Sequence, residues 1–246
     1  MEMKKLIALI LSAVLCLSLG ACGSSKVEGR GYKSPEDALL AYADALKAGD
    51  VSKILSTFAV ETYVENYNLE EYLNLTHVYN IGTGVLENDT PFARDLNLSR
   101  RQSGIVSNLY YMYVYMSQGD GYLPAIYITN DHADAEDFLD DFVIDDWMEI
   151  LSEMEYDDDF TYLDDVFEDE LVDVAEDHLD DSCDLYGCDE IVSLGLEIEL
   201  DGADYLLCMD VACYDGKWYN LSPVGSIGTW LGISALSGGL CADYYY

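Results

Sequence analysis

The chain has 246 residues, of which half are hydrophobic, and it carries 48 acidic residues against 11 lysines and arginines. This amount of apolar material excludes a disordered acidic tail, and the length allows one or two domains. The formal net charge of −37 excludes nucleic acid as a partner, because such a surface repels phosphate backbones, and it repels an anionic membrane surface as well.

The N-terminus has the layout of a secretory signal. Lys4 and Lys5 precede an apolar run over residues 6–19, which is shorter than the roughly 20 residues that span a bilayer but suits the core of a signal peptide. Leu19-Gly20-Ala21-Cys22 comes next, followed by the polar Gly23-Ser24-Ser25. Small residues before a cysteine resemble the signal of bacterial lipoproteins, in which a peptidase cuts before the cysteine and the thiol carries a diacylglycerol.

This resemblance implies that residues 1–21 are removed, that Cys22 is lipidated, and that the protein is anchored in the cell membrane at its extracytoplasmic face. An uncleaved N-terminal anchor is the alternative, and it leaves the protein on the same side of the membrane. Residues 22–33 are rich in glycine and polar side chains, so we expect them to form a short tether before the folded domain.

The chain after the tether predicts helices. Ser34-Pro35-Glu36-Asp37 combines a capping serine, a proline suited to the first helical position and two acids at the positive end. Apolar residues then recur at helical spacing, namely Leu39, Tyr42, Ala43 and Leu46. Asp50 is expected to cap a second helix, with Ile54, Leu55 and Phe58 on one face.

Two further helices are expected before the middle of the chain. Asn68 opens one of them, with Glu71 as its capping partner. The stretch 77–98 contains glycines, Asn88 and Pro91 and is predicted to be mostly loop. The other helix is expected over residues 103–116, where it presents Ile105, Leu109, Met112 and Met116.

The middle of the chain is strongly acidic. Within residues 131–181, 24 of 51 residues are acidic, yet apolar residues keep a helical period. The two apolar stripes are Leu139, Val143, Trp147, Ile150, Leu151 and Met154, and then Leu163, Val166, Phe167, Leu171, Val174, Ala175 and Leu179. We therefore predict two acidic amphipathic helices joined near Asp157-Asp158-Asp159, and interpret residues 131–181 as an acidic helical insertion.

The C-terminal third changes to the period of a β-strand. Apolar and polar residues alternate over residues 192–200, and Asp201-Gly202 is typical of a tight hairpin turn. Pairing outward from this turn matches apolar residues on one face, in the pairs Leu200–Ala203, Ile198–Tyr205, Leu196–Leu207, Leu194–Met209 and Val192–Val211. A second turn at Asp215-Gly216 returns Lys217-Trp218-Tyr219 beside Cys213. Residues 225–240 are predicted as a short packed helix or a covering loop, and residues 243–246 as a frayed tail.

Helices followed by an antiparallel meander define an α+β order. The order resembles the NTF2-like (cystatin-like) domains of bacterial lipoproteins, on the strength of residues 34–50, Phe58 and Asp215-Gly216-Lys217-Trp218-Tyr219. The resemblance implies a single α+β domain over residues 34–246, in which a curved sheet is closed by helices. Because this fold carries binding proteins and enzymes alike, it implies no particular activity.

Metal-binding patterns are weak. Asp157-Asp158-Asp159-Phe160-Thr161 lacks the alternating ligands and glycine of a calcium loop, which favours solvated helix faces, with weak divalent cation binding as the alternative. His77, His132 and His178 are the histidines of the chain, and His132 shares a helix face with Glu136 if that stretch is helical. Since no second histidine is close in sequence, a surface histidine is favoured over a metal ligand.

The cysteines leave two interpretations open. Five remain after the signal and the lipidated residue are set aside, namely Cys183, Cys188, Cys208, Cys213 and Cys241. Cys208 and Cys213 point to opposite faces of one strand and cannot pair, whereas Cys183 and Cys188 flank a four-residue loop and could form a bridge. The alternative is that all five are buried apolar groups.

The sequence gives little support for catalysis. Gly225-Ser226-Ile227-Gly228 has the wrong spacing for a nucleophile elbow, and no glycine-rich phosphate loop precedes a helix. Tyr110, Tyr111, Tyr113 and Tyr115 could line a groove, although packing against the sheet explains them better. We expect a non-catalytic protein without cofactors that binds a small ligand or a cell-envelope partner. The alternatives are an envelope hydrolase with a carboxylate pair and a transporter-associated solute-binding protein.

Overall fold

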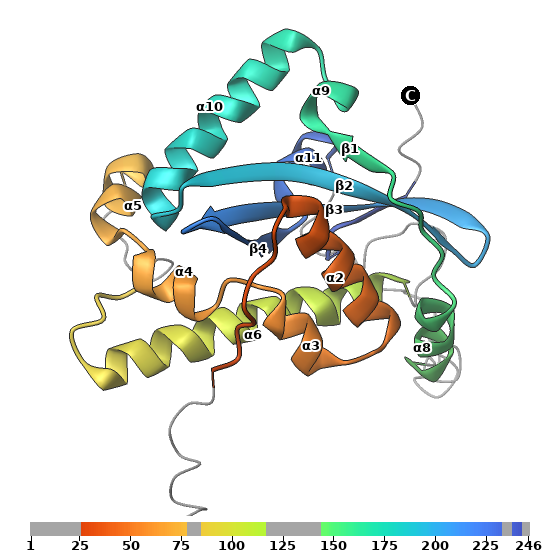
Figure 1. Cartoon of the computed structure of the whole chain (residues 1–246), viewed down its shortest axis with the longest axis horizontal. Helices are drawn as coiled ribbons and strands as arrows, with labels where there is room; N and C mark the ends of the chain where they lie inside the picture. Colours follow the sequence, from red (N-terminus) through yellow and green to blue (C-terminus); the bar gives the residue numbers. More distant parts are fainter. Residues whose placement is uncertain (1–25, 78–84, 117–143, 233–237, 243–246) are drawn as a thin grey trace, which may run out of the picture.

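The structure, a computed structural model, describes residues 26–77, 85–116, 144–232 and 238–242. It is an α+β fold in which N-terminal helices pack on a C-terminal antiparallel sheet, as the sequence predicted (Figure 1). The helices are α2 (Pro35–Lys47), α3 (Val51–Ser56), α4 (Glu61–Asn66), α5 (Leu69–Thr76), α6 (Pro91–Met116), α8 (Ile144–Ser152), α9 (Leu163–Val166), α10 (Asp169–Tyr186) and α11 (Gly225–Trp230). The strands are β1 (Phe160–Tyr162), β2 (Glu190–Leu200), β3 (Ala203–Tyr214), β4 (Lys217–Pro223) and β5 (Leu240–Ala242).

The predicted hairpin register is confirmed in full. Leu196 pairs with Leu207, and the other four predicted pairs of β2 and β3 are also present. Asp201 and Gly202 both have positive φ, at 51° and 74°, as a tight hairpin turn requires. The second turn has the same form at Asp215 and Gly216, so β4 returns along β3. The strands lie in the order β1-β2-β3-β4, and β5 pairs with β3.

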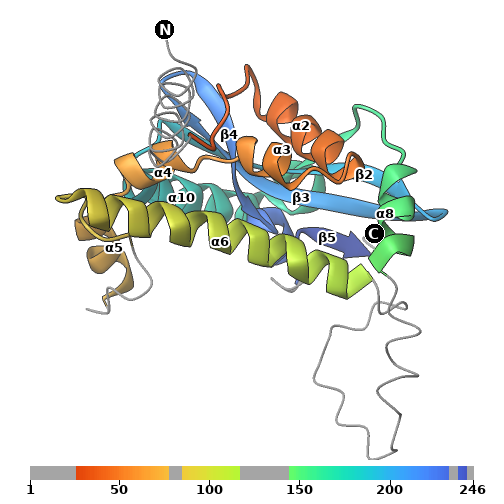
Figure 2. The ribbon, with the colours of Figure 1, turned by 90° about the horizontal axis from the view of Figure 1, so that it is seen from below.

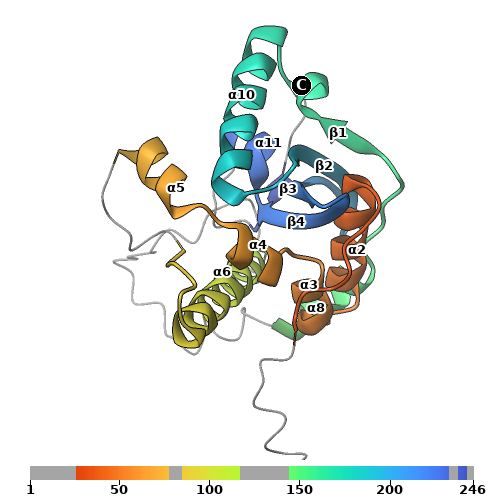
Figure 3. The same cartoon turned by 60° about the vertical axis from the view of Figure 1, so that its left-hand side comes forward.

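Helices cover both faces of this sheet. On one face, Leu194 and Leu196 of β2 and Leu207 of β3 pack in a core with Leu39 and Tyr42 of α2. The opposite face forms a second core, in which residues of β3 meet α10 and α11; its members include Leu206, Cys208, Leu179 and Ile227. Figure 3 shows α2 and α10 on opposite sides of the sheet.

The helix starts follow the predicted caps. The Ser34 hydroxyl accepts a hydrogen bond from the Asp37 amide at 3.1 Å, and Asp50 accepts one from the Lys53 amide at 3.1 Å. Asn68 caps α5 by accepting from the amides of Glu70 and Glu71.

The prediction of a loop over residues 77–98 is wrong at its end, because α6 already begins at Pro91. Thr90 accepts a hydrogen bond from the Ala93 amide at 3.1 Å, so Thr90-Pro91 starts α6 in the way that Ser34-Pro35 starts α2. The helix predicted over residues 103–116 is the second half of this 26-residue helix.

The acidic segment contains its two predicted helices as α8 and α10, and the structure adds strand β1 and the short α9 between them. The predicted apolar stripe of the second helix is wrong at Leu171 and Val174, which are 42% and 52% exposed. These residues lie near the start of α10, which projects beyond the sheet in Figure 1, so only its later turns are covered. Residues 131–143, with His132 and Glu136, lie outside the described residues.

The N-terminal strap, residues 27–32, ties the start of the described chain to the domain. Glu28 is buried and accepts from the amides of Val60 and Thr62 at 2.7 and 2.8 Å and from the Thr62 hydroxyl at 2.5 Å. Glu61 in turn accepts from the amides of Val27 and Glu28 at 2.8 and 3.0 Å. Part of the segment predicted as a tether is therefore bound to the domain.

Two C-terminal features complete the fold. The short helix predicted as one option for residues 225–240 is present as α11, and β5 begins at Leu240. The predicted frayed tail lies outside the described residues.

Among the helices that the structure describes, none is both long enough and apolar enough to cross a membrane.

Candidate functional site

A bulge beside the edge of β2 creates the candidate site. Glu155 and Glu199 exchange backbone hydrogen bonds of 3.0 and 2.8 Å, and Phe160 pairs with Leu196. Five peptide steps separate Glu155 from Phe160, whereas only three separate their partners, so residues 156–158 bulge out of the pairing. Bulges of this kind are frequent beside functional sites, because they redirect side chains.

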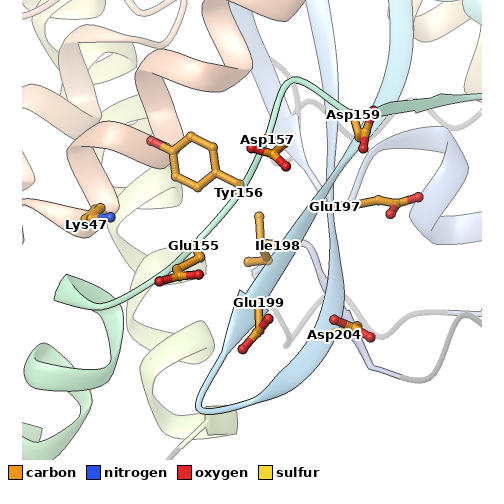
Figure 4. A pocket seen from close by; sticks show the side chains of 9 residues that line it. All are labelled: Lys47, Glu155, Tyr156, Asp157, Asp159, Glu197, Ile198, Glu199 and Asp204. Carbon is orange, nitrogen blue, oxygen red and sulfur yellow. The ribbon is translucent and has the colours of Figure 1, made fainter.

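The bulge opens a cavity of about 450 Å³ against β2. Its lining is rich in carboxylates, and Figure 4 shows these side chains spread along the loop and the hairpin around Ile198. The lining residues are Lys47, Glu155, Tyr156, Asp157, Asp159, Glu197, Ile198, Glu199 and Asp204. All six carboxylate residues are exposed, so the cavity presents a solvated, negatively charged wall.

Tyr156 supplies an aromatic wall and is fixed in place. Its hydroxyl donates to the Asp44 carboxylate of α2 at 2.5 Å. Burial, together with this hydrogen bond, raises the pKa of Tyr156 above its ordinary value, so the phenol stays neutral. Lys47 is the cation of the lining, and its ammonium donates to the Met154 carbonyl at 2.7 Å and lies 6.0 Å from the centroid of the Tyr156 ring.

A second tyrosine holds the other end of the same segment. The Tyr162 hydroxyl donates to the Glu36 carboxylate at 2.6 Å. Burial and the hydrogen bond to Glu36 raise the pKa of Tyr162 to about 12. Two tyrosine–carboxylate hydrogen bonds therefore attach residues 156–162 to α2, which keeps the bulge in position.

This arrangement suits a ligand with positive charge. Several exposed carboxylates produce a negative potential that attracts cations, and an aromatic face adds attraction for an ammonium or guanidinium group. A bound metal ion has less support, because the described residues contain no group of three histidine, cysteine or acidic side chains arranged to hold one.

A second hollow of about 500 Å³ lies between α10 and β2. Leu179, Ile191 and Val192 contribute apolar surface there, beside acidic residues that include Glu176 and Asp180. The bulge cavity is the better candidate, because it is built on an irregularity of the sheet that the fold holds in place at both ends.

The other described residues that were considered as candidate site residues in the sequence do not line the bulge cavity. His77 ends α5 with φ 50°, and His178 lies exposed on α10. Cys22, the predicted lipidation site, lies outside the described residues. Of the predicted tyrosines, Tyr113 is partly buried against the core, as the packing interpretation predicts, whereas Tyr110 and Tyr111 are 63% and 39% exposed.

Among the described residues, no disulfide joins any of Cys183, Cys188, Cys208, Cys213 and Cys241. Cys183 and Cys188 form no bridge, and the Cys188 thiol instead lies 4.0 Å from the Cys183 carbonyl oxygen. Cys208, Cys213 and Cys241 are buried, as expected for small apolar groups, and burial raises the pKa of the Cys208 thiol well above its ordinary value.

Sequence reasoning did not find the bulge cavity. One signal was available, because the predicted hairpin register places Glu199 directly opposite Asp204, and the structure contains this pair. Like charges directly opposite each other destabilise a sheet, so this pair draws attention to the acidic end of the hairpin.

Comparison with known proteins supports the fold. The chain is similar to a cystatin-like protein from Ruminococcus gnavus ATCC 29149, with a TM-score of 0.50 and 12% sequence identity. The match covers 76% of this chain and 39% of that chain, and at this identity it shows the cystatin-like α+β fold alone. No protein-family model and no curated protein matches the sequence.

The charges of the acidic helix α10 lead us to expect that the melting temperature depends on salt concentration. Asp169, Asp173, Asp177 and Asp181 follow one another at intervals of four and are exposed, and each such like-charge pair costs about 0.2–0.5 kcal/mol. We expect the melting temperature to rise between about 10 mM and about 0.15 M NaCl, as screening sets in.

Calcium at matched ionic strength serves as the control for this response. It should give the same melting curve as NaCl, because the described residues contain no group of three ligands for it. A further rise with calcium would indicate a specific site. A melting temperature that does not change with salt would show that repulsion along α10 is too weak to affect the stability of the protein.

Proposed function

We propose that this protein is a lipid-anchored, extracytoplasmic binding protein that takes a small, positively charged ligand in the bulge cavity. The main observation that supports this proposal is that six exposed carboxylates and the fixed Tyr156 ring line one cavity of about 450 Å³. A polyamine is a ligand of the right class, because several of its ammonium groups can contact carboxylates along the wall while another faces the ring.

Spermine is the probe for this proposal, with calorimetry as the measurement. Replacing Glu197 and Glu199 by glutamine removes two lining charges and preserves side-chain shape. Each exposed ion pair contributes about 0.2–1 kcal/mol, so the double variant should bind spermine about 2- to 30-fold more weakly.

The matched control is the double variant Asp173→Asn/Asp177→Asn on α10, which changes the net charge equally outside the cavity. It should bind spermine as the unmodified chain does. Equal weakening by both double variants would show that spermine responds only to the overall charge, and the proposed cavity would then have no role.

The membrane location is proposed from Cys22 and the apolar run before it. Cys22→Ser is expected to abolish labelling by a clickable fatty acid and to leave an unprocessed precursor or release the protein to the medium. The measurement is in-gel fluorescence at the mass of the protein in labelled cells. Equal labelling of the unmodified chain and Cys22→Ser would contradict the anchor.

A further inference from the structure

Helix α6 carries an apolar stripe on its outer face. Phe92, Leu96, Val106 and Tyr110 are 76%, 47%, 40% and 63% exposed. Their spacing of 4, 10 and 4 residues places them on one side of an α-helix, along about 27 Å. The opposite side of α6 is buried in the core through residues that include Ile105 and Met112.

The charge of α6 differs from that of the rest of the protein. It contains three arginines and a single acid, Asp95, whereas α10 contains eight acids and no lysine or arginine. Figure 2 shows α6 and α3 in front when the molecule is seen from below, with α10 behind them. Helix α6 by itself is therefore weakly basic, with Arg94 paired to Glu65 of α4, whereas α10 is strongly acidic.

The start of the described chain lies on the α6 side. Lys26 and Arg94 of α6 line the same small hollow, and the strap fixes the chain from Val27 onward. Figure 1 likewise shows the start of the coloured chain on the side where α6 lies. Only four peptide steps separate Cys22 from Lys26, so these two Cα atoms are at most about 14 Å apart.

These observations together point to one occupant for the apolar stripe. We propose that α6 lies along the surface of the lipid bilayer, with Phe92, Leu96, Val106 and Tyr110 at the interface and α10 directed away from it. The inference rests on the proposed lipidation of Cys22, which brings the first turns of α6 close to the lipid headgroups. Apolar and aromatic side chains on the outer side of a helix suit this interface, whereas the acidic α10 would be repelled by anionic lipid.

Hydroxyl-radical footprinting tests this orientation. The acylated mature protein is placed in vesicles of phosphatidylethanolamine and phosphatidylglycerol, and the Cys22→Ser chain in solution is the reference. Oxidation of Phe92 and Tyr110 is expected to fall at least about threefold on vesicles, because lipid covers the stripe. Leu171 and Trp230, which are 42% and 40% exposed on α10 and α11, should be oxidised equally in both samples.

Exposed side chains also allow a test by substitution without disturbing the core. The triple variant Phe92→Ser/Leu96→Ser/Val106→Ser removes most of the stripe and retains Tyr110 as a reporter. Its Tyr110 should lose protection on vesicles. The matched double variant Leu171→Ser/Val174→Ser, also exposed, should keep Tyr110 protected.

A separate experiment distinguishes failure of the proposed lipidation of Cys22 from failure of the proposed orientation of α6. If intact mass shows no acyl group on Cys22, the anchor proposal fails, and α6 is tested with the mature chain held on nickel-chelating lipid by an N-terminal hexahistidine. Vesicle-bound protein whose Phe92 and Tyr110 are oxidised as in solution overturns the inference. Protection that appears without vesicles and grows with protein concentration also overturns it, since a second copy would then cover α6.

Discussion

Leu196→Ala is expected to lower the free energy of unfolding by about 2–5 kcal/mol, because it leaves a cavity at a fully buried cross-strand pair. Leu196 and its partner Leu207 are both 0% exposed and belong to the core beneath α2. The measurement is urea denaturation followed by far-ultraviolet circular dichroism, with the slope of the transition checked for two-state behaviour.

The neighbouring residue provides the control for this experiment. Glu197 is exposed and lies on the other face of β2, so Glu197→Ala should change the stability by no more than about 0.5 kcal/mol. Similar losses for the two variants would mean that the register of the hairpin is shifted by one residue, which would exchange the two faces.

Glu28→Ala is the second variant for which we expect a large effect, about 2–5 kcal/mol of lost stability, because it leaves three donors without their acceptor. These donors are the amides of Val60 and Thr62 and the Thr62 hydroxyl. Loss of the carboxylate should also free the strap, so amide hydrogen exchange at Val60 and Thr62 should accelerate.

Lys26→Ala tests whether the ion pair rather than the backbone contacts matters. The Lys26 ammonium lies 3.7 Å from the Glu28 carboxylate, but its side chain is 62% exposed. Because the lysine end of this pair is exposed to solvent, we expect it to contribute at most about 1 kcal/mol. If Lys26→Ala and Glu28→Ala lost equal stability, the strap would be held by charge rather than by the buried hydrogen bonds.

Short sequence motifs were sufficient to predict those elements whose geometry depends on residues close together in the chain. The period-two alternation and Asp201-Gly202 gave every predicted pair of the β2–β3 hairpin, because a turn with two positive φ angles fixes the register. Ser34-Pro35 gave the start of α2 in the same way. The same signature occurs at Thr90-Pro91, but it follows a stretch containing Gly82 and Gly84 that favours a loop, so the start of α6 is hard to predict there.

Elements that depend on distant partners could not be predicted. Strand β1 has three residues beside a run of aspartates, and its pairing with β2 is what makes it a strand. The cavity has the same origin, since Lys47 binds the carbonyl of Met154, 107 residues further along the chain. Such contacts follow from the packing of α2 against the sheet, and no local pattern in the sequence specifies them.

The bulge over residues 156–158 is a place where the length of the chain can change without disturbing the sheet. Its two ends are fixed by the backbone bridge at Glu155 and by the pairing of Phe160 with Leu196. Each doubling of the length of such a closed loop costs only about 0.6 kcal/mol. Residues can therefore be inserted there while the strand register stays unchanged, which makes the loop a suitable position for selecting new binding specificities on a constant scaffold.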